Sequence, residues 1–426
     1  MEAWKLNIQL LAYAGTLVNA TDGYVNAYTG AKESFSGKND LSVQMKEYYD
    51  TELLENARAN LVHSQFAKKQ GLPKNRGRII EFRKWNTLED AGELQEGVIP
   101  AAQKLGSTSI SKALTQHGTY TAVTDILELH AIDDVILGAT TELGASAGTT
   151  QDKLVRNVMV AGTNKQLCDK VVNGVHTKVA TRAGLDKTAR LTPDEINKAV
   201  TTLKKLKAPT INGKYIAIIH PSVAYDLRNS DGWIEAHKYA SPTEIFTGEI
   251  GELHGVRFVE TTEAKIFAGA DLASDSRTLK VKTAISSAGK NIAFEGGTVA
   301  TDALKGRLIL VGDVLCEVAS NTASSITVKE NVNNIEAGAV IAPGEGGAGG
   351  LAVYATMVFG KDAYGMVDPE GGNLQMIIKD KATAGGPLDQ FSTLGYKFEN
   401  ASLILYEDRM VRIESCGEYS DVDEEN

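Results

Sequence analysis

The chain has 426 residues, which is enough for about three domains or for one large core with insertions. Its 42% hydrophobic and 23% charged residues exclude a disordered chain, and a net charge of −10 without a basic stripe argues against binding to nucleic acid phosphates. No segment approaches the roughly 18 to 20 apolar residues that a membrane span requires. We expect a folded protein that begins at Met1 and stays in the cytoplasm where it is made.

The first part of the chain is predicted to be an extended arm followed by a helical segment. Residues 1–40 mix Ala, Thr, Gly, Asn and Tyr without a sustained period, so we expect an arm that becomes ordered only against another surface. Residues 41–76 show helical spacing of apolar residues from Leu41 to Lys69. The helix is expected to stop at Gly71-Leu72-Pro73.

Residues 77–124 are predicted to form two strands that project a long acidic hairpin. Strand-forming sequences lie at Arg78–Trp85 and at Ser107–Val123. The connection of about twenty residues between them has no core pattern, which is typical of disorder or of a loop that makes contacts.

Residues 125–190 contain the strongest helical signal in the sequence. Between Ile132 and Ala161 the apolar residues keep to one stripe for most of the segment. At about 1.5 Å per residue such a helix would be on the order of 45 Å long, unless Gly144 or Gly148 interrupts it.

Residues 191–269 alternate between helical and strand patterns, which predicts a sheet flanked by helices. The sequence Thr192-Pro193-Asp194-Glu195 is typical of a helix start, with Thr192 as the cap and Glu195 completing a capping box. This helix is expected to run to about Lys207.

The segment Lys214–His220 is predicted to be a short strand, followed by a helix with Ser222 as its N-cap. His220 and Ser222 lie two residues apart, but a catalytic Ser–His pair also needs a sharp elbow, an oxyanion hole and an orienting acid, and GxSxG is absent. An enzyme whose active site is assembled from distant residues around His220 or His130 is kept as an alternative.

Residues 270–345 change to short strands separated by Gly, Ser, Asn and Asp, which predicts a small β-barrel or sandwich inserted into a larger α+β domain. A β-rich adhesion module is a further alternative for the protein, suggested by this segment. The sequence Gly344–Gly349 matches GxGxxG, but a phosphate cradle needs a helix immediately afterwards, and Leu351–Tyr354 has a strand pattern. We therefore expect a flexible hinge where the insertion rejoins its host.

The final residues return to the larger domain through the strands LQMIIKD and RMVRIES and end in an acidic segment. Its acids, from Glu414 to Glu425, lack the ligand rhythm of a calcium loop, so we expect a solvated C-terminus. No metal site is predicted, because the seven histidines are scattered singly. His130 with Asp133 and Asp134 is the closest cluster, and the macrodipole of a helix explains these aspartates more simply. The three cysteines show no zinc spacing and are expected to be reduced thiols.

Several long strings in this sequence closely resemble major capsid proteins of tailed bacteriophages, specifically the N-four-like coat-protein family. They are KEYYDTELLENARANLVHSQF, EFRKWNT, LTPDEINKAVTTLKKLKAPTINGKYIAIIHPSVAYDLRN, LHGVRFVETTEAKIF and YEDRMVRIESC. The resemblance runs through most of the chain outside about 270–350. It implies an α+β protein with the HK-97-like phage capsid fold, which has an N-arm, an extended β-hairpin loop, a peripheral domain with a long spine helix, and an axial domain.

On that fold the inserted small β-rich domain is the one departure, because it follows no fixed family pattern. The resemblance implies the following division: 1–40 the N-terminal arm; 41–76 the helical segment leading into the peripheral domain; 77–124 the extended hairpin loop; 125–190 the peripheral domain with the spine helix; 191–269 the first part of the axial domain; 270–345 the inserted domain; 346–370 the axial return; and 371–426 the peripheral return strands and acidic C-terminus. No lysine and asparagine pair is identified for a crosslink between subunits, so none is predicted.

The resemblance implies a major capsid protein that self-assembles into hexamers and pentamers of an icosahedral head shell, assembled in the cytoplasm of the bacterial host. An arm and a hairpin that cannot bury their own apolar groups need neighbouring copies, and repeated heterologous contacts close into rings. We expect no enzyme activity, no cofactor, no membrane contact and no sequence-specific nucleic acid binding; scaffold, decoration and portal proteins are the other partners that the family allows. The candidate subunit-contact residues lie on the hairpin: Arg78, Arg83, Lys84, Trp85, Glu89, Asp90, Glu93 and Glu96.

Overall fold

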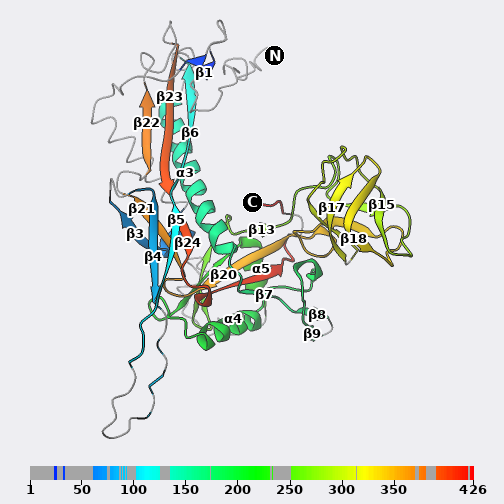
Figure 1. The fold of residues 1–426 in the computed structure, drawn as a ribbon, viewed down its shortest axis with the longest axis horizontal. Helices are drawn as coiled ribbons and strands as arrows, with labels where there is room; N and C mark the ends of the chain where they lie inside the picture. Colours follow the sequence, from blue (N-terminus) through cyan, green and yellow to red (C-terminus); the bar gives the residue numbers. More distant parts are fainter. Residues whose placement is uncertain are drawn as a thin grey trace. The chain divides into compact units, whose positions relative to one another are not determined.

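Figure 1 shows the fold of the chain as a ribbon, in a computed structural model. It describes residues 24–25, 32–33, 61–73, 77–85, 88, 90–91, 93, 102–124, 135–172, 174–230, 233, 251–312, 314–369, 374–379, 390–420 and 423–426. The chain is of the α+β class and divides into two compact units. The first unit comprises Met1–Val155 and Gly365–Leu405, and the second comprises Arg156–Tyr364 and Tyr406–Asn426.

The core of the first unit lies between the long helix α3 (Val135–Val160) and an antiparallel sheet. The sheet has the order β22–β23–β6, with the bounds β22 Gln375–Lys379, β23 Phe391–Asn400 and β6 Thr115–Thr124. The apolar stripe of α3 places Leu143 and Ala147 against Leu394 and Phe398 of β23. The predicted long helix is confirmed from Val135 onward, and residues 131–134 lie outside the described residues.

Neither Gly144 nor Gly148 interrupts α3, although each glycine costs a helix interior about 1 kcal/mol relative to alanine. Both glycines are buried. Packing of the apolar stripe against the sheet outweighs this local cost, because each buried leucine or phenylalanine contributes roughly 1.5 to 3 kcal/mol.

The helix predicted to run to Lys69 is wrong over the residues that can be seen. Leu61–Phe66 contains only the short 3-10 helix η2 (His63–Phe66), and the chain then becomes the strand β3 (Lys68–Leu72). This strand pairs in parallel with β21 (Tyr364–Pro369), whose other neighbour is β24 (Ser402–Ile404). Pairing with a segment about three hundred residues away thus overrides the local helical pattern. Residues 41–60 of that prediction lie outside the described residues.

A buried carboxylate fixes the start of this segment. Oδ1 of Asp152 on α3 accepts the backbone N–H groups of Val62 (3.0 Å), His63 (2.7 Å) and Ser64 (3.3 Å), and its Oδ2 lies 2.6 Å from Nδ1 of His63. His63 is 1% exposed and Asp152 is fully buried. Such a carboxylate satisfies several backbone donors at once, and so turns the chain away from helical geometry at Leu61–Phe66.

The predicted hairpin is confirmed, but it is shorter than expected. β4 (Ile79–Trp85) pairs with β5 (Ser107–Ala113) in an antiparallel register. At the buried Leu114 the chain leaves the hairpin, and β6 pairs with β23 along all ten of its residues. The single strand expected over Ser107–Val123 is therefore two strands, because a second sheet captures its latter half.

The second unit is organised around a mixed sheet of seven strands. Its order is β11–β12–β10–β20–β25–β7, and β13 also pairs with β20. The bounds are β7 Lys165–Leu167, β10 Tyr215–Ile219, β11 Glu252–Leu253, β12 Val256–Glu260, β13 Ile266–Phe267, β20 Val353–Phe359 and β25 Met410–Cys416. β10, β20 and β25 are buried along their whole length, as expected for strands covered on both faces.

The strand RMVRIES was expected to return to the same domain as LQMIIKD, and this expectation is wrong. β25 pairs antiparallel with β20 from Val353↔Cys416 to Phe359↔Met410, in the sheet that also contains β10. The strand LQMIIKD corresponds to β22, which belongs to the first unit. β25 is buried along its whole length even though it carries Arg412 and Glu414, so its residue pattern does not indicate which of the two sheets it joins.

Two helices pack on this sheet at the predicted positions: α4 (Pro193–Lys205) and α5 (Pro221–Arg228). The capping box expected at Thr192 is wrong, because its side chain makes no cap bond and the Glu195 carboxylate binds Gln166 (2.7 Å) and Lys198 (2.7 Å). The N-cap of α5 is also different from the prediction. Nδ1 of His220, rather than the Ser222 hydroxyl, accepts the first free N–H, at 3.2 Å.

The inserted segment is a closed barrel, which settles the alternative between barrel and sandwich; Figure 1 shows its strands in yellow and light orange. Its order is β14–β15–β18–β17–β16–β19, with the bounds β14 Leu279–Val281, β15 Gly289–Glu295, β16 Leu308–Val311, β17 Val314–Asn321, β18 Ser325–Val332 and β19 Val340–Pro343. Its first and last strands are neighbours, with Leu279 opposite Ile341. The barrel has its own core, which includes Ile309, Val318 and Ile326, each fully buried.

The glycine-rich segment after the barrel is tightly packed, so the expectation of a flexible hinge is wrong. A side chain at Gly347 would lie 2.7 Å from the carbonyl oxygen of Leu185, and one at Gly346 would lie 2.8 Å from that of Leu351. The short 3-10 helix η4 (Ala348–Gly350) follows and leads into β20. The α-helix N-terminus that a phosphate cradle needs does not follow these glycines.

The remaining described elements are short. They are β1 (Tyr24–Val25), β2 (Lys32–Glu33), β8 (Lys170–Val172), β9 (Val175–Thr177), η3 (Arg182–Gly184) and η5 (Glu407–Arg409). β1 pairs with β2, and β8 pairs with β9.

Candidate assembly surface

The β4–β5 hairpin has one face turned to solvent along its whole length. Successive side chains of a strand alternate between faces, and Ile79, Glu81, Arg83 and Trp85 are all exposed, whereas Ile80 and Phe82 are buried. Opposite these four residues, β5 presents small side chains: Ala113, Ser111, Ser109 and Ser107. The result is a narrow surface of large side chains beside a row of hydroxyls.

Large apolar residues gather on this hairpin. Ile79 is 65% exposed and Trp85 is 53% exposed, and towards the tip Leu88 and Leu105 are 52% and 56% exposed. Scattered single apolar residues are normal on a protein surface, but a run of them along one hairpin is typical of a surface that a partner covers.

The structure separates the residues predicted to contact other subunits. Arg78 has a role within the chain, since its Nε donates to the carbonyl oxygen of Leu114 (2.9 Å) and its own carbonyl oxygen accepts from Leu114 N (2.9 Å). Arg83 and Trp85 share the exposed face, while Lys84 is half-buried on the other face. Asp90 and Glu93 are exposed, and Glu89 and Glu96 lie outside the described residues.

Sequence reasoning missed the apolar members of this surface. The sequence pattern places Ile79 in a predicted strand and Leu88 and Leu105 in the predicted acidic loop, and indicates none of them as a contact residue. The sequence does hold a signal for them. Ile79 alternates with Ile80 along β4, so one of these two apolar side chains has to face away from the core, and Leu88 and Leu105 are apolar residues in a connection that has no core pattern.

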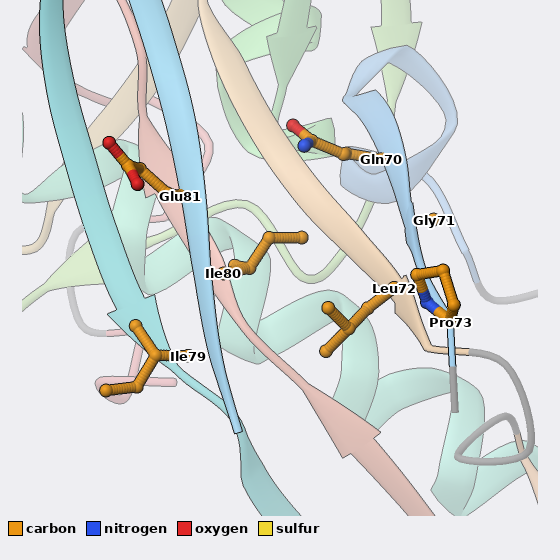
Figure 2. A pocket seen from close by; sticks show the side chains of 7 residues that line it. All are labelled: Gln70, Gly71, Leu72, Pro73, Ile79, Ile80 and Glu81. Carbon is orange, nitrogen blue, oxygen red and sulfur yellow. The ribbon is translucent and has the colours of Figure 1, made fainter. Parts of the chain in front are cut away.

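A cavity of about 300 Å³ opens between β3 and β4, within the first unit. Figure 2 shows Ile80 of β4 and Leu72 of β3 directed toward each other across this space, while Ile79 and Glu81 point to the opposite side of β4. Within the described residues β3 ends its sheet and β4 pairs only with β5. The cavity therefore lies between two strand edges, and its lining is mixed, with Gln70 and Glu81 beside the apolar Leu72, Pro73, Ile79 and Ile80.

The residues around His220 do form a polar cluster, which bears on the enzyme alternative. The Ser222 hydroxyl lies 3.3 Å from Asp423 Oδ2, the Tyr354 hydroxyl donates to the same oxygen (2.6 Å), and the His220 ring stacks on Tyr354 with centroids 5.0 Å apart. In a nucleophilic pair the imidazole would accept the proton of the serine. Here the serine bonds to the carboxylate and Nδ1 of His220 caps a helix, so the geometry is that of a docking contact.

Ionisation in this cluster follows from burial and hydrogen bonding. Burial lowers the pKa of His220, and burial together with the bond to Asp423 raises the pKa of Tyr354. For Asp423 burial alone would raise the pKa, but the hydroxyls of Ser420 and Tyr354 outweigh it and the pKa lies below its usual value. A neutral histidine and a charged aspartate therefore hold the chain end at neutral pH.

The acidic end was expected to be solvated, and this holds for part of it: Glu418, Glu424 and Glu425 are exposed, whereas other residues of the segment are held by the fold. Arg156, only 2% exposed, donates to the carbonyl oxygens of Glu263 and Asn426 (both 2.9 Å). Lys265 lies 2.8 Å from Glu425. Glu414, an acid of the same segment, is fully buried.

Glu414 lies at the centre of a buried ion cluster. Its two oxygens accept from Nε and Nη2 of Arg182 (2.7 and 2.8 Å), and Arg412 donates to it at 2.8 Å. The guanidinium of Arg182 lies 3.5 Å from the centre of the Phe267 ring. Burial alone would raise the pKa of Glu414, but the two arginines hold it below its usual value.

The part of the chain described by the structure gathers no three His, Cys, Asp or Glu residues in a way that could hold a metal ion. None of its helices is both long enough and apolar enough to cross a bilayer. The three cysteines, all described, are buried and unbridged.

Comparison with known proteins gives the family. Residues 110–368, more than half of the chain, match the family described as phage capsid protein. The capsid of Ralstonia phage GP4 is similar in fold, with a TM-score of 0.52 and 12% identity over 93% of this chain and 98% of that one. The capsid of cyanophage Pam1 has a TM-score of 0.50 and 12% identity over 93% and 99% of the two chains.

A search of curated proteins found no match. The narrower N-four-like assignment stays a prediction from the sequence strings. The architecture is the HK-97-like capsid fold. With its family match and its capsid neighbours in fold, the chain belongs to the phage capsid protein family.

Proposed function

We propose that this chain is the major subunit of an icosahedral phage head, in which copies form hexamers and pentamers around the packaged genome. Membership in the phage capsid protein family supports a structural role in the virion. Assembly would take place in the host cytoplasm, and scaffold, decoration and portal proteins would be its further partners.

The observation that carries the proposal is the exposed apolar surface of the β4–β5 hairpin. Its four large apolar residues, each about half exposed, would contribute on the order of 4 kcal/mol when a neighbour covers them. Fixing one protein on another costs about 4 to 15 kcal/mol, so one such contact is too weak for a stable pair. In a closed ring each subunit makes the contact twice, once with its hairpin and once as the acceptor, and the ring is stable where the pair is not.

The proposal is tested by expressing the chain and examining it by sedimentation and negative-stain electron microscopy. We expect closed particles or ring-shaped capsomers. Ile79→Ser combined with Trp85→Ser should leave a folded subunit that forms few or none, whereas Leu315→Ser, a change at a barrel residue that is 46% exposed, serves as the matched control. A compact monomer at high concentration for the unmodified chain would refute the proposal.

A further inference from the structure

The chain passes between the seven-stranded sheet and the barrel through a neck, which consists of the entry segment 269–271 and the exit segment 343–347. Ala268, just before the entry segment, is fully buried in the core of the sheet. The two segments meet at Gly269, where a side chain would lie 2.5 Å from Cβ of Pro343. Gly269 has φ of 70°, a conformation that glycine adopts without strain. The neck is therefore a close contact of two single chain segments.

Two arginines on the barrel side hold the entry segment to the barrel. Nη2 of Arg277 donates to the carbonyl oxygen of Ala268 (3.0 Å), and Nη1 of Arg307 donates to that of Asp271 (2.9 Å). Arg307 also donates to the carbonyl oxygen of Ala270. The entry segment should therefore move together with the barrel.

The exit segment is held on the side of the sheet. A side chain at Gly347 would lie 2.7 Å from the carbonyl oxygen of Leu185, which belongs to the core of the sheet. The same oxygen accepts the N–H of Ala348 (2.7 Å), and Nη1 of Arg182 donates to the carbonyl oxygen of Glu345 (3.4 Å). Any rotation of the barrel against the sheet would therefore pivot about the exit segment.

Residues 423–426, which we call the strap, fasten the entry segment to the sheet. Oε1 of Glu425 accepts from Nζ of Lys265 (2.8 Å), and its Oε2 accepts the N–H of Gly269 (3.2 Å). Lys265 directly precedes β13 of the sheet, whereas Gly269 is the first residue of the neck. One carboxylate thus joins the sheet to the neck.

The side chain of Asn426 adds a second fastening, along the edge of β13. Its Oδ1 accepts the N–H of Ile266 (3.1 Å), and its Nδ2 donates to the carbonyl oxygen of Ala264 (2.9 Å). Figure 1 marks the C-terminus beside β13. The amide of this asparagine supplies the donor and the acceptor that a neighbouring strand would offer to the edge.

The strap is held by polar bonds rather than by a core of its own. Nη2 of the buried Arg156 donates to the carbonyl oxygen of Asn426 (2.9 Å), and the hydroxyl of the buried Tyr354 donates to Asp423 (2.6 Å). The strap has no helix or strand, and its middle residues are exposed. Contacts between exposed charges weaken as salt is added, so the strap is a fastening that can open while the sheet stays folded.

We propose that the strap locks the barrel at its neck, and that release of the strap lets the barrel turn about the exit segment. With the strap in place, both segments of the neck are fastened to the sheet. Without it the entry segment is free from Gly269 onward, and a body that is fastened through one segment pivots there. The device lies within one chain, so it goes beyond the proposed function and does not depend on it.

Two backbone amides report directly on the strap, because their acceptors are its side chains. In the variant that combines Glu425→Ala with Asn426→Ala, the amides of Ile266 and Gly269 should exchange with solvent faster by about tenfold or more. In the unmodified chain, high salt should speed exchange at Gly269 in the same direction, because the ion pair beside it is screened.

The controls show whether the loss is local and electrostatic. The amide of Ala355, which donates to the carbonyl oxygen of Lys265 (2.9 Å), should keep its exchange rate, and Glu424→Ala, at an exposed residue of the strap, should change neither reporter. Lys265→Met leaves the strap sequence intact and should also speed exchange at Gly269. Combining it with Glu425→Ala should add little, because both changes remove the same contact.

The orientation of the barrel is measured between two spin labels by double electron–electron resonance. The labels are attached to Lys280→Cys on the barrel and Lys204→Cys on α4, both at exposed positions, and the native cysteines are buried. Labelled chains are diluted in an excess of unlabelled chains, so that only distances within one chain are recorded. The distance distribution should become broader by about twofold or more in the strap variant, and should stay unchanged in Glu424→Ala.

Faster exchange at both amides together with a broader distance distribution would support the lock. Unchanged exchange would mean that the strap does not fasten the neck, and faster exchange with an unchanged distribution would mean that other contacts hold the barrel; either result overturns the inference. Neither result bears on the shell function, which is tested by particle formation. Circular dichroism of each variant verifies that the sheet and the barrel remain folded.

Discussion

The carboxylate of Asp152 offers a direct test of what holds the chain ahead of β3 on the long helix. It accepts three backbone N–H groups and contacts the His63 ring, all in a buried setting. Asp152→Ala leaves those donors without an acceptor, at about 1 to 3 kcal/mol for each buried group. We expect a loss of roughly 3 to 5 kcal/mol in the free energy of unfolding, which is also the range for removing one partner of a buried charged contact.

The matched variant is Asp152→Asn, which keeps an oxygen for the backbone donors and should cost about 1 to 2 kcal/mol. Glu142→Ala, at an exposed position of the same helix, should cost less than about 0.5 kcal/mol. Urea denaturation measures the free energies, and hydrogen exchange at Val62–Ser64 shows where protection is lost. A loss of 4 kcal/mol opens these amides about a thousandfold more often. If the alanine and asparagine variants lose equal stability, the donors are satisfied in another way and the reasoning is refuted.

Three further outcomes follow from the second unit. Because the pKa of Glu414 is lowered on folding, its contribution to stability is complete above the ordinary glutamate pKa of about 4.3 and is lost as the pH falls below that value. The urea midpoint should therefore decline more between pH 7 and pH 3 in the unmodified chain than in Glu414→Gln. Parallel curves for the two proteins would contradict this role of Glu414. Ile309→Ala, in the barrel core, should lower the free energy of unfolding by about 2 to 5 kcal/mol. Leu308→Ala, at the neighbouring residue that is 41% exposed, should lower it by less than about 1 kcal/mol. Equal losses in thermal unfolding would mean that the barrel core is not packed as described. Replacing Ala273–Pro343 with a short glycine and serine linker should leave the seven-stranded sheet folded. The first and last barrel strands are neighbours, so a short linker can join the two ends of the remaining chain. Loss of the far-ultraviolet circular dichroism signal would show that the sheet depends on the barrel.

The elements that could be predicted from the sequence are those whose pattern is local. The stripe of α3, the apolar run of β10 and the strands β4 and β5 follow from periodicity, and the structure has all of them. Near-regular short strands separated by turn residues were enough to predict an inserted β domain, but left barrel and sandwich open until the structure showed a closed barrel. The exposed hairpin could also be predicted, because its connection has no core pattern.

The elements that could not be predicted depend on partners far away in the sequence. The helix predicted to run to Lys69 gives way to the strand Lys68–Leu72 through pairing with β21, and the residues of β25 do not specify the sheet that it joins. Glu195 has the spacing of a capping box, yet Gln166 and Lys198 take its carboxylate. The candidate contact residues are a similar case. The sequence shows that charged and apolar residues are present on the hairpin, but it does not show that Ile79 and Trp85 share an exposed face.

The open face of the hairpin has a consequence for the subunit before it reaches a shell. A contiguous apolar surface that its partner has not yet covered is a site of non-specific aggregation. Along the exposed face of β4–β5 only Glu81 and Arg83 are charged, between Ile79 and Trp85, and the facing strand offers serines that a foreign backbone can approach closely. Newly made chains that wait too long should therefore precipitate through their hairpins, so the speed of head growth limits how much of this protein a cell can keep in usable form.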